Sequence, residues 1–328
     1  MIEGSLLELL ACPLDRGPLH VDGAGLRCPE GHRFPVVSGI PVLLGDVTDP
    51  THPYLRLTME KVGQPLQEAA AVEPGKVDAF VQDEIVKTNG NLYRHLLGHL
   101  PRYPIPDIRL PAGEGRSLLD VGANWGRWSL AAARNGWRPV ALDPWIDAAL
   151  AGGRVARQLG LNVRFVVGDA RHLPFRDGCF EASFSYSVLQ HFQKEAARES
   201  IAEMSRVTTD GGTVLVQLPN VFGARQMMNF VRQRLSRDAN PFRVRYWTPK
   251  EIRSTFERLV GPTRIEVDGF FSLNAQTADL DLLPARHAAV VRASEALRRI
   301  AREFPPLALV ADSLYADARK DRRSSANG

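Results

Sequence analysis

Strands alternate with helices over residues 117–219, and this rhythm constrains the fold more than any other feature of the chain. Short apolar runs such as SLLDVG and RPVALD are each followed by a segment with the spacing of an amphipathic helix. Strands that alternate with helices of this length form a mainly parallel sheet with helices on both faces. With the later strand-like runs included, the sequence predicts an α/β fold with a doubly wound, mainly parallel, seven-stranded sheet.

The composition limits the class of protein. The chain has 328 residues, of which 44% are hydrophobic and 24% are charged, a balance typical of globular proteins. No apolar stretch is long enough for a transmembrane helix, and the N-terminus lacks the basic start of a signal peptide, so we expect a cytoplasmic protein. Three cysteines argue against a disulfide framework. A net charge of +4 allows a nucleic-acid partner, although an arginine-rich coding background is the favoured explanation.

Polar side chains stand where the predicted strands end. Asp120, Asp143 and Asp169 close the first three strands of the sheet, and Ser185 lies at the end of the fourth. Ligands of open parallel sheets bind at the carboxyl ends of the strands. Asp143 also follows the first turn by about 20 residues, a position from which an acid can bind ribose hydroxyls. The pattern therefore predicts a nucleoside-bearing ligand at this edge.

The turn after the first strand, DVGANWG, refines this interpretation. Gly122 and Gly126 favour a tight turn in which the backbone approaches a ligand closely, because glycine has no Cβ. A dinucleotide fold would need G-x-G-x-x-G to bind a pyrophosphate at a helix N-terminus. Here an acid, Asp120, precedes the glycines, and an acid favours a cationic ligand such as S-adenosylmethionine.

These segments resemble class I S-adenosylmethionine-dependent methyltransferases, in particular the broad type 11 group that includes quinone-biosynthesis enzymes. DVGANWG is similar to the family's D-x-G-x-G-x-G motif. ALDP, GDARHLPFRDGCFEASFSYSVLQHF and MSRVTTDGGTVLVQLPN resemble its later motifs, in the same order. The resemblance covers residues 115–220 well and extends weakly towards the C-terminus.

The resemblance implies a role for each residue at the strand ends. Asp120 would face the methionine ammonium group, Gly122 would line the cofactor with its backbone, and Asp143 would accept both ribose hydroxyls. Asp169 would accept the adenine amino group, with the backbone amide of Ala170 nearby.

Two further positions of the motif region matter to this comparison. Ser185 would line the methionine end of the cofactor. Asn124 stands where the family usually has glycine, in the turn that Gly126 closes. Because asparagine tolerates positive φ better than most residues, we expect the turn to keep its shape.

His191, in SVLQHF, is the candidate general base, since its ordinary pKa suits proton transfer near neutral pH. The alternative is that His191 caps the following helix or packs against a pocket wall, and methyltransferases of this kind often need no protein base. Other candidates for the rim of the site, each more often a packing residue, are Tyr93, Tyr186, Asn220, Tyr246 and Trp247.

The N-terminal segment has the layout of a small zinc ribbon. Its candidate ligands, Cys12, Asp15, Cys28 and His32, form the pairs C-x2-D and C-x3-H. Four such ligands can hold a tetrahedral zinc ion, although Asp15 departs from the usual C-x2-C. The segment resembles the zinc ribbon related to the activator subunit of tRNA methyltransferases and the ribbon of bacterial ribosomal RNA guanine methyltransferases. A metal-free ribbon held by its apolar residues is the alternative.

We expect four parts along the chain. They are a zinc-ribbon-like β domain (1–45), a linker (46–76), a methyltransferase domain (77–317) with a substrate-side insertion at about 220–249, and a disordered tail (318–328). The predicted fold class is therefore an α/β methyltransferase fold with a small zinc-ribbon-like β domain at its N-terminus.

The predicted function is methyl transfer from S-adenosylmethionine to a small-molecule acceptor in a biosynthetic pathway. An RNA methyltransferase that uses its ribbon to bind RNA is the first alternative, and a non-catalytic binding protein on the same fold is the second. The small molecule is favoured because the fourth strand ends in SYSVLQ, not in the N/D-P-P-Y/F signature of many enzymes that methylate bases on nitrogen.

Overall fold

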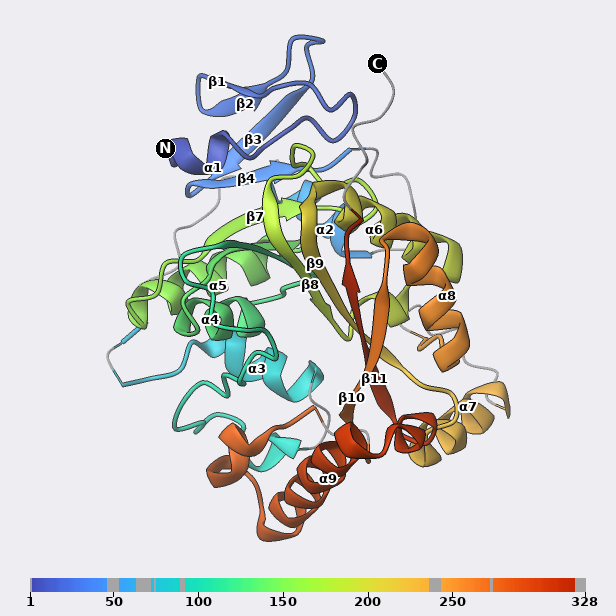
Figure 1. Ribbon diagram of the computed structural model, residues 1–328. Coiled ribbons are helices and arrows are strands. Elements are labelled where there is room, and N and C mark those ends of the chain that lie inside the picture. Colours follow the sequence, from blue (N-terminus) through green and yellow to red (C-terminus); the bar gives the residue numbers. More distant parts are fainter. Residues whose placement is uncertain are drawn as a thin grey trace. The chain divides into compact units, whose positions relative to one another are not determined.

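Figure 1 shows the computed structural model of the chain. The chain divides into two compact units. Unit 1 comprises Met1–Arg176 and Asn274–Ala288, and unit 2 comprises Asp177–Leu273 and Ala289–Gly328. Parts of the predicted linker (46–76), of the substrate-side insertion (220–249) and of the tail (318–328) lie outside the residues that the structure describes. Those residues are 2–45, 53–62, 72–73, 75–88, 92–235, 243–271 and 274–321.

The N-terminal part of unit 1 is a small antiparallel β structure. It consists of α1 (Gly4–Leu7), β1 (His20–Asp22), β2 (Gly25–Arg27), β3 (Arg33–Val37) and β4 (Ile40–Leu43), paired in sequence order. Its interior is formed by Leu6, Leu10, Leu26, Phe34 and Ile40, all of them buried. This is the small β domain that the sequence predicts.

This β structure is joined to the larger sheet of the same unit. β4 pairs in parallel with β7 (Arg164–Gly168), and Val42 lies opposite Val167 in the register. A second connection runs from the amide of Ala11 to the carbonyl of Pro174, at 3.0 Å. The segment GIPVLL therefore ends the ribbon and begins the edge of the sheet, which explains why β4 is buried on both faces.

The rest of the sheet in unit 1 is parallel, in the order β4, β7, β6 (Arg138–Asp143), β5 (Ser117–Val121). α4 (Arg127–Arg134) connects β5 to β6, and α5 (Ile146–Gln158) connects β6 to β7. β5 is buried throughout, as expected for a parallel strand covered on both faces.

Two more helices cover this sheet, together with the 3-10 turns η2 (Arg94–Leu96) and η4 (Thr277–Leu282). α2 (Pro53–Val62) falls within the predicted linker, and α3 (Ala79–Thr88) packs against α5. The fully buried Thr58 of α2 donates its hydroxyl to the carbonyl of Pro144 (2.7 Å) and accepts the amide of Ile146 (3.1 Å). α2 therefore caps the loop that follows β6.

Unit 2 carries a second group of strands. β8 (Phe180–Tyr186) is parallel to β9 (Thr208–Pro219), while β11 (Ser313–Arg319) pairs antiparallel with both β9 and β10 (Thr263–Gly269). The remaining elements are η3 (Leu189–His191), α6 (Lys194–Val207), α7 (Ala224–Leu235), α8 (Pro249–Leu259), α9 (Ala285–Glu303) and η5 (Pro305–Leu309).

The expected fold class is confirmed. β5 to β11 are the seven strands predicted from the alternating pattern, and five of them, β5 to β9, lie in parallel pairs with their helical connections. None of the helices described by the structure is long and apolar enough to cross a membrane.

Candidate functional site

Three residues in the turn between β5 and α4 have positive φ. Gly122 has φ 78°, Asn124 has φ 51° and Gly126 has φ 83°. The amides of Gly122 and Ala123 both donate to the carbonyl of Leu142, at 2.8 and 2.9 Å, which ties the turn to the end of β6. Asn124 adopts the left-handed conformation expected where the family motif has glycine.

Asp143 is fixed beside this turn by two backbone amides. Its Oδ2 accepts the amide of Asn124 at 2.8 Å, and its Oδ1 accepts the amide of Trp145 at 3.0 Å. Burial raises the pKa of Asp143 to about 6, against the opposing effect of the two amides. The carboxyl group is thus held in one orientation before any ligand arrives.

Asp120, at the end of β5, is 2% exposed and accepts the hydroxyl of Ser129 at 2.6 Å. Burial, and to a lesser extent the nearby charge of Asp143, raise its pKa to about 7 against the opposing effect of Ser129. The structure therefore brings Asp120, which is buried, and Asp143, which is half-buried, together as an interacting pair of acids. Such a pair is costly when both are ionised and no cation is near.

Glu84 is a third acid at this place, and the sequence analysis did not identify it. It lies on α3, is 3% exposed, and its Oε2 accepts the side-chain amide of Asn124 at 3.2 Å. Its charge contributes to the raised pKa of Asp143. An acid in an amphipathic helix normally faces solvent. Only the burial of Glu84 in the folded protein identifies it as part of the site.

Three aromatic side chains, which the sequence patterns did not indicate, pack around the loop after Asp143. Trp145 stacks on Tyr54 of α2, with ring centroids 4.5 Å apart and planes 10° apart. Phe80 of α3 meets the same indole edge-on at 4.9 Å. Two helices distant in sequence thus fix the residues that follow β6.

Asp169, beyond the end of β7, is engaged by its neighbour Arg171. The guanidinium donates to both carboxylate oxygens at 2.5 to 3.1 Å, and the amide of Arg171 donates to Oδ1 at 2.9 Å. The pair is largely buried, with side-chain exposures of 12% and 11%. Ala170 is buried beside it. Arg171 is a partner that the sequence analysis did not assign.

The candidates of unit 2 occupy a different set of elements. Ser185 is fully buried in β8. His191 ends η3, where its Nε2 lies 3.3 Å from the side-chain nitrogen of Gln190 and its carbonyl accepts the guanidinium of Arg245 at 2.7 Å. The histidine backbone is therefore anchored, while its imidazole is partly exposed.

The five rim candidates are mostly occupied in packing or in structural hydrogen bonds. Asn220 donates to the carbonyl of Ala311 at 2.8 Å, and Tyr186 donates to Asp268 at 3.0 Å. Trp247 is fully buried and lies 5.0 Å from the ammonium of Lys194. The other two are Tyr93, which is buried in unit 1, and Tyr246, whose pKa burial raises.

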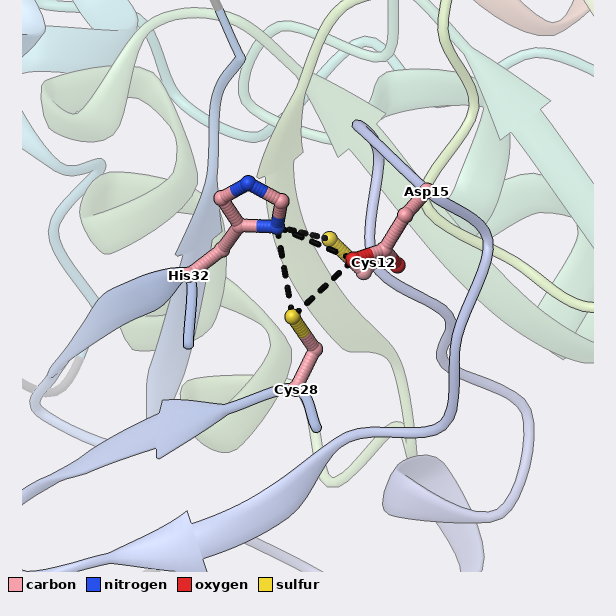
Figure 2. A group of neighbouring side chains, drawn as sticks. All are labelled: Cys12, Asp15, Cys28 and His32. Atoms are coloured by element: carbon pink, nitrogen blue, oxygen red, sulfur yellow. Dashed lines mark hydrogen bonds and ion pairs between the residues drawn. The ribbon is translucent and has the colours of Figure 1, made fainter. Parts of the chain in front are cut away.

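The ribbon gathers its four candidate ligands into one cluster. Figure 2 shows the side chains of Cys12, Asp15, Cys28 and His32 converging, with the Nδ1 atom of the histidine facing both sulfur atoms. Nδ1 lies 3.6 Å from the Cys12 sulfur, 3.2 Å from the Cys28 sulfur and 3.0 Å from Oδ2 of Asp15. The Cys28 sulfur lies 3.1 Å from the same oxygen.

The donor set and its spacing fit a zinc ion. The four ligand atoms all lie within 4.8 Å of one another. In a tetrahedron built with ordinary Zn–S, Zn–N and Zn–O distances, ligand atoms are roughly 3.3–3.8 Å apart. Burial raises the pKa of the Cys12 thiol to about 11. A zinc ion needs thiolates, so its binding would release these protons.

Two protein families match separate parts of the chain. Residues 118–212 match the family described as methyltransferase domain, and residues 5–39 match the Trm112p-like proteins. Both matches fall on the segments whose motifs resemble these families, so the methyltransferase and Trm112-related resemblances drawn from the sequence are confirmed for those residues.

Among curated relatives, ajmaline N-methyltransferase of Rauvolfia serpentina is 30% identical over 32% of this chain and 37% of its own length. Demethylmenaquinone methyltransferase of Renibacterium salmoninarum is 34% identical over 31% of this chain and 40% of its own. The chain thus spans less than half the length of these relatives. A solved complex of the Haloferax volcanii Trm112 methyltransferase activator with a methyltransferase contains a chain 17% identical, with a TM-score of 0.45, covering 74% of this chain and 94% of that one.

Proposed function

We propose that this protein is a methyltransferase that uses S-adenosylmethionine and modifies a small molecule. The observation that carries the proposal is the group of three acids, Glu84, Asp120 and Asp143, beside a turn with positive φ at three positions. The raised pKa values of Asp120 and Asp143 mean that these two carboxyl groups resist ionisation in the ligand-free protein. A ligand that brings an ammonium and a sulfonium group removes that resistance.

The acids keep the hydrogen-bonding capacity that the proposed roles need. Each carboxylate oxygen can accept about two hydrogen bonds. Asp143 uses one position on each oxygen for the amides of Asn124 and Trp145, so both oxygens can still accept a ribose hydroxyl. Asp120 uses one position for Ser129 and can accept the methionine ammonium, directly or through water. Asp169 would accept the adenine amino group beside its bonds to Arg171.

The chemistry divides between the cofactor and the chain. S-adenosylmethionine supplies a methyl group on a positively charged sulfur atom, which is reactive without activation by the protein. The residues of the chain bind and orient the reactants, and proximity of this kind is the main catalytic contribution expected of them. The role of Ser185 as a residue that lines the cofactor stays a prediction. So does the role of His191 as a general base, which applies to methyl acceptors that must lose a proton.

The proposed acceptor class rests on two observations. The names of the two curated relatives given above both specify small organic acceptors, ajmaline and demethylmenaquinone. The fourth strand of the domain ends in SYSVLQ, which lacks the N/D-P-P-Y/F signature of many enzymes that methylate bases on nitrogen. An RNA acceptor is the second candidate, because the Trm112p-like match and a net charge of +4 favour it. A cytoplasmic location stays a prediction.

Calorimetric titration with S-adenosylmethionine tests the cofactor site. We expect micromolar binding by the wild type and at least tenfold weaker binding by Asp143→Asn, which keeps the shape of the side chain but removes its charge. Asp107→Asn is the matched control, since Asp107 is an exposed acid of the same unit. Affinity should fall as the pH is lowered through 7 and 6, where Asp120 and Asp143 take up protons. A folded wild type that does not bind leaves the non-catalytic alternative.

The acceptor class is tested with cofactor labelled in its methyl group. The protein is incubated in parallel with a small-molecule extract and with total RNA. Label that enters the organic fraction and survives ribonuclease treatment supports the proposal. Label that enters RNA and is released by ribonuclease replaces it with the second candidate.

We also propose that the cluster in the ribbon holds a structural zinc ion. Cys12, Asp15, Cys28 and His32 supply the donors, and the ribbon is too small to rely on its apolar interior alone.

A further inference from the structure

A hollow lies in unit 1, at the opposite end of α5 from the loop that follows Asp143. It has a volume of about 790 Å³ and is lined at the ends of α4 and α5 by Arg134, Arg157 and Leu159. Twelve residues separate Trp145 from Arg157, which corresponds to about 18 Å along a helix axis. The hollow is therefore distinct from the group of acids at the carboxyl ends of the strands.

Five of the twelve residues that line this hollow are basic. Three of them have acidic partners: Lys76 pairs with Glu73, Arg102 with Asp281, and Arg154 with Asp78. Only the Arg154–Asp78 pair is well buried, at 2.7 Å with side-chain exposures of 15% and 4%. Surface pairs such as the other two bind weakly and can be rearranged by a competing anion.

Arg134 and Arg157 complete the set of five cations. In the part of the chain that the structure describes, neither guanidinium takes part in a hydrogen bond or an ion pair. Both also stand in the last turn of their helices, where a positive charge stabilises the helix dipole. That role accounts for their position on each helix but not for their convergence with three other cations on one hollow.

The wall of the hollow is fixed by a hydrogen-bonded network. Tyr103 donates its hydroxyl to the side chain of Gln158 at 2.6 Å and accepts the amide of Asp78 at 2.9 Å. Gln158 donates in turn to the carbonyl of Lys76 at 2.8 Å. The chain before α3 is thereby held against the end of α5, so the hollow is preformed. Tyr103 and Val77, both 7% exposed, give it an apolar side.

From this geometry we propose that the hollow binds an organic phosphate of nucleotide size. Planar guanidinium groups recognise phosphate oxygens through paired hydrogen bonds, and two of them are available here. The volume lies in the range of small-molecule sites, and the apolar wall fits a base or another apolar group. A nucleic-acid strand would instead require a positive stripe along the surface, whereas these cations face a concavity. The proposal is independent of the proposed methyl transfer.

The test is calorimetric titration with inorganic pyrophosphate and with ATP, at 150 mM salt, on the full chain. The wild type should bind ATP more tightly than pyrophosphate, because only ATP also fills the apolar side. Arg134→Gln and Arg157→Gln should each weaken binding of both probes by about tenfold, the expected loss of one charged hydrogen bond. Arg138→Gln is the matched control, since Arg138 is an exposed arginine near Arg134 that does not line the hollow.

Asp143→Asn separates this site from the proposed cofactor site. Unchanged ATP affinity in Asp143→Asn, with loss in the two arginine variants, supports the proposal even if S-adenosylmethionine does not bind. Four results would overturn it. They are no binding of either probe at millimolar concentration, an equal loss in Arg138→Gln, a lower melting temperature of the arginine variants with unchanged affinity, and tighter binding of a short single-stranded RNA through the same arginines.

Discussion

The ribbon cluster and the acids beside the turn both gather ionisable side chains, but they are supported in different ways. In the ribbon, Cys12, Cys28 and His32 make most of their polar contacts within the cluster itself. Beside the turn, Asp143 is held by two backbone amides and Asp120 by the hydroxyl of Ser129. The first arrangement is one that a shared ion would complete, whereas the hydrogen bonds of the chain itself orient the second.

The difference follows from the size of the surrounding structure. The ribbon contributes four strands of three to five residues, too few to bury a large interior. The turn lies between buried parallel strands and two helices, so its geometry is determined by packing. Metal removal should therefore affect the ribbon most, and changes at the turn should affect ligand binding and pH dependence.

Loss of a ribbon ligand is expected to have the largest effect. Cys28→Ala should remove one bound zinc per chain and lower the free energy of unfolding by about 4 kcal/mol, because structural zinc is a major part of the stability of such small domains. Since β4 pairs with β7, the loss should extend to the edge of the larger sheet. Elemental analysis and urea denaturation measure the two quantities.

Cys179→Ala is the control for this change, because Cys179 lies outside the cluster. It should keep the metal. If the wild type contains no zinc and Cys28→Ala is equally stable, the ribbon is metal-free. The proposed difference between a metal-dependent ribbon and a turn determined by packing would then be wrong.

Neutralising Asp120 should give the next largest effect, and it should stabilise the protein. The pKa of Asp120 rises from 3.8 in the unfolded chain to about 7 in the folded protein, so between these pH values the folded state binds more protons. Stability contributed by this group therefore falls as the pH rises through that range. Asp120→Asn should gain about 3 kcal/mol at pH 8, and the gain should shrink towards pH 4.

Denaturation curves of Asp120→Asn at several pH values measure this gain, and cofactor titration should show that binding is lost. Asp107→Asn, at an exposed position, should show no comparable pH dependence. An Asp120→Asn protein that is less stable than the wild type at pH 8 would mean that the acid is already compensated by a partner in the ligand-free state.

A pair of glycine substitutions compares the two regions directly. Gly126 has φ 83°, and a Cβ there would lie 3.0 Å from the ring of Phe165, so Gly126→Ala combines backbone strain with a steric clash. Gly23, in the β1–β2 turn, has φ 60° but open space around it. We expect about 2 kcal/mol of destabilisation for Gly126→Ala and about 1 kcal/mol for Gly23→Ala. Thermal melting checks both, and equal losses would show that packing adds nothing at the turn.

Asn124→Gly is expected to have the smallest effect. Glycine restores the usual family residue and relieves the left-handed backbone, but it removes the hydrogen bond to Glu84. The two effects oppose each other, so stability should change by about 1 kcal/mol or less. Cofactor affinity, measured by calorimetry, should change by only a few-fold. A loss as large as that of Asp143→Asn would make Asn124 a binding residue in its own right.

The sequence predicted the elements whose local signals agree with their surroundings. The strands from β5 to β9 and their helices follow from alternating apolar patterns. The four ribbon residues were identified because cysteine and histidine at short spacing have few other uses in such a segment. The expectation that Asn124 keeps the shape of the turn followed from the glycine that the family usually has there and from asparagine's tolerance of positive φ.

By itself, then, the sequence determined the fold class, the two domain families and the chemical type of the candidate residues, since these depend on residue type and spacing. Only the tertiary structure decided which distant residues join them. Glu84 reaches the turn from α3, Thr58 caps the loop after β6, and β4 extends the sheet beside β7. Such contacts depend on how helices and strands far apart in the chain pack, and no local pattern encodes that.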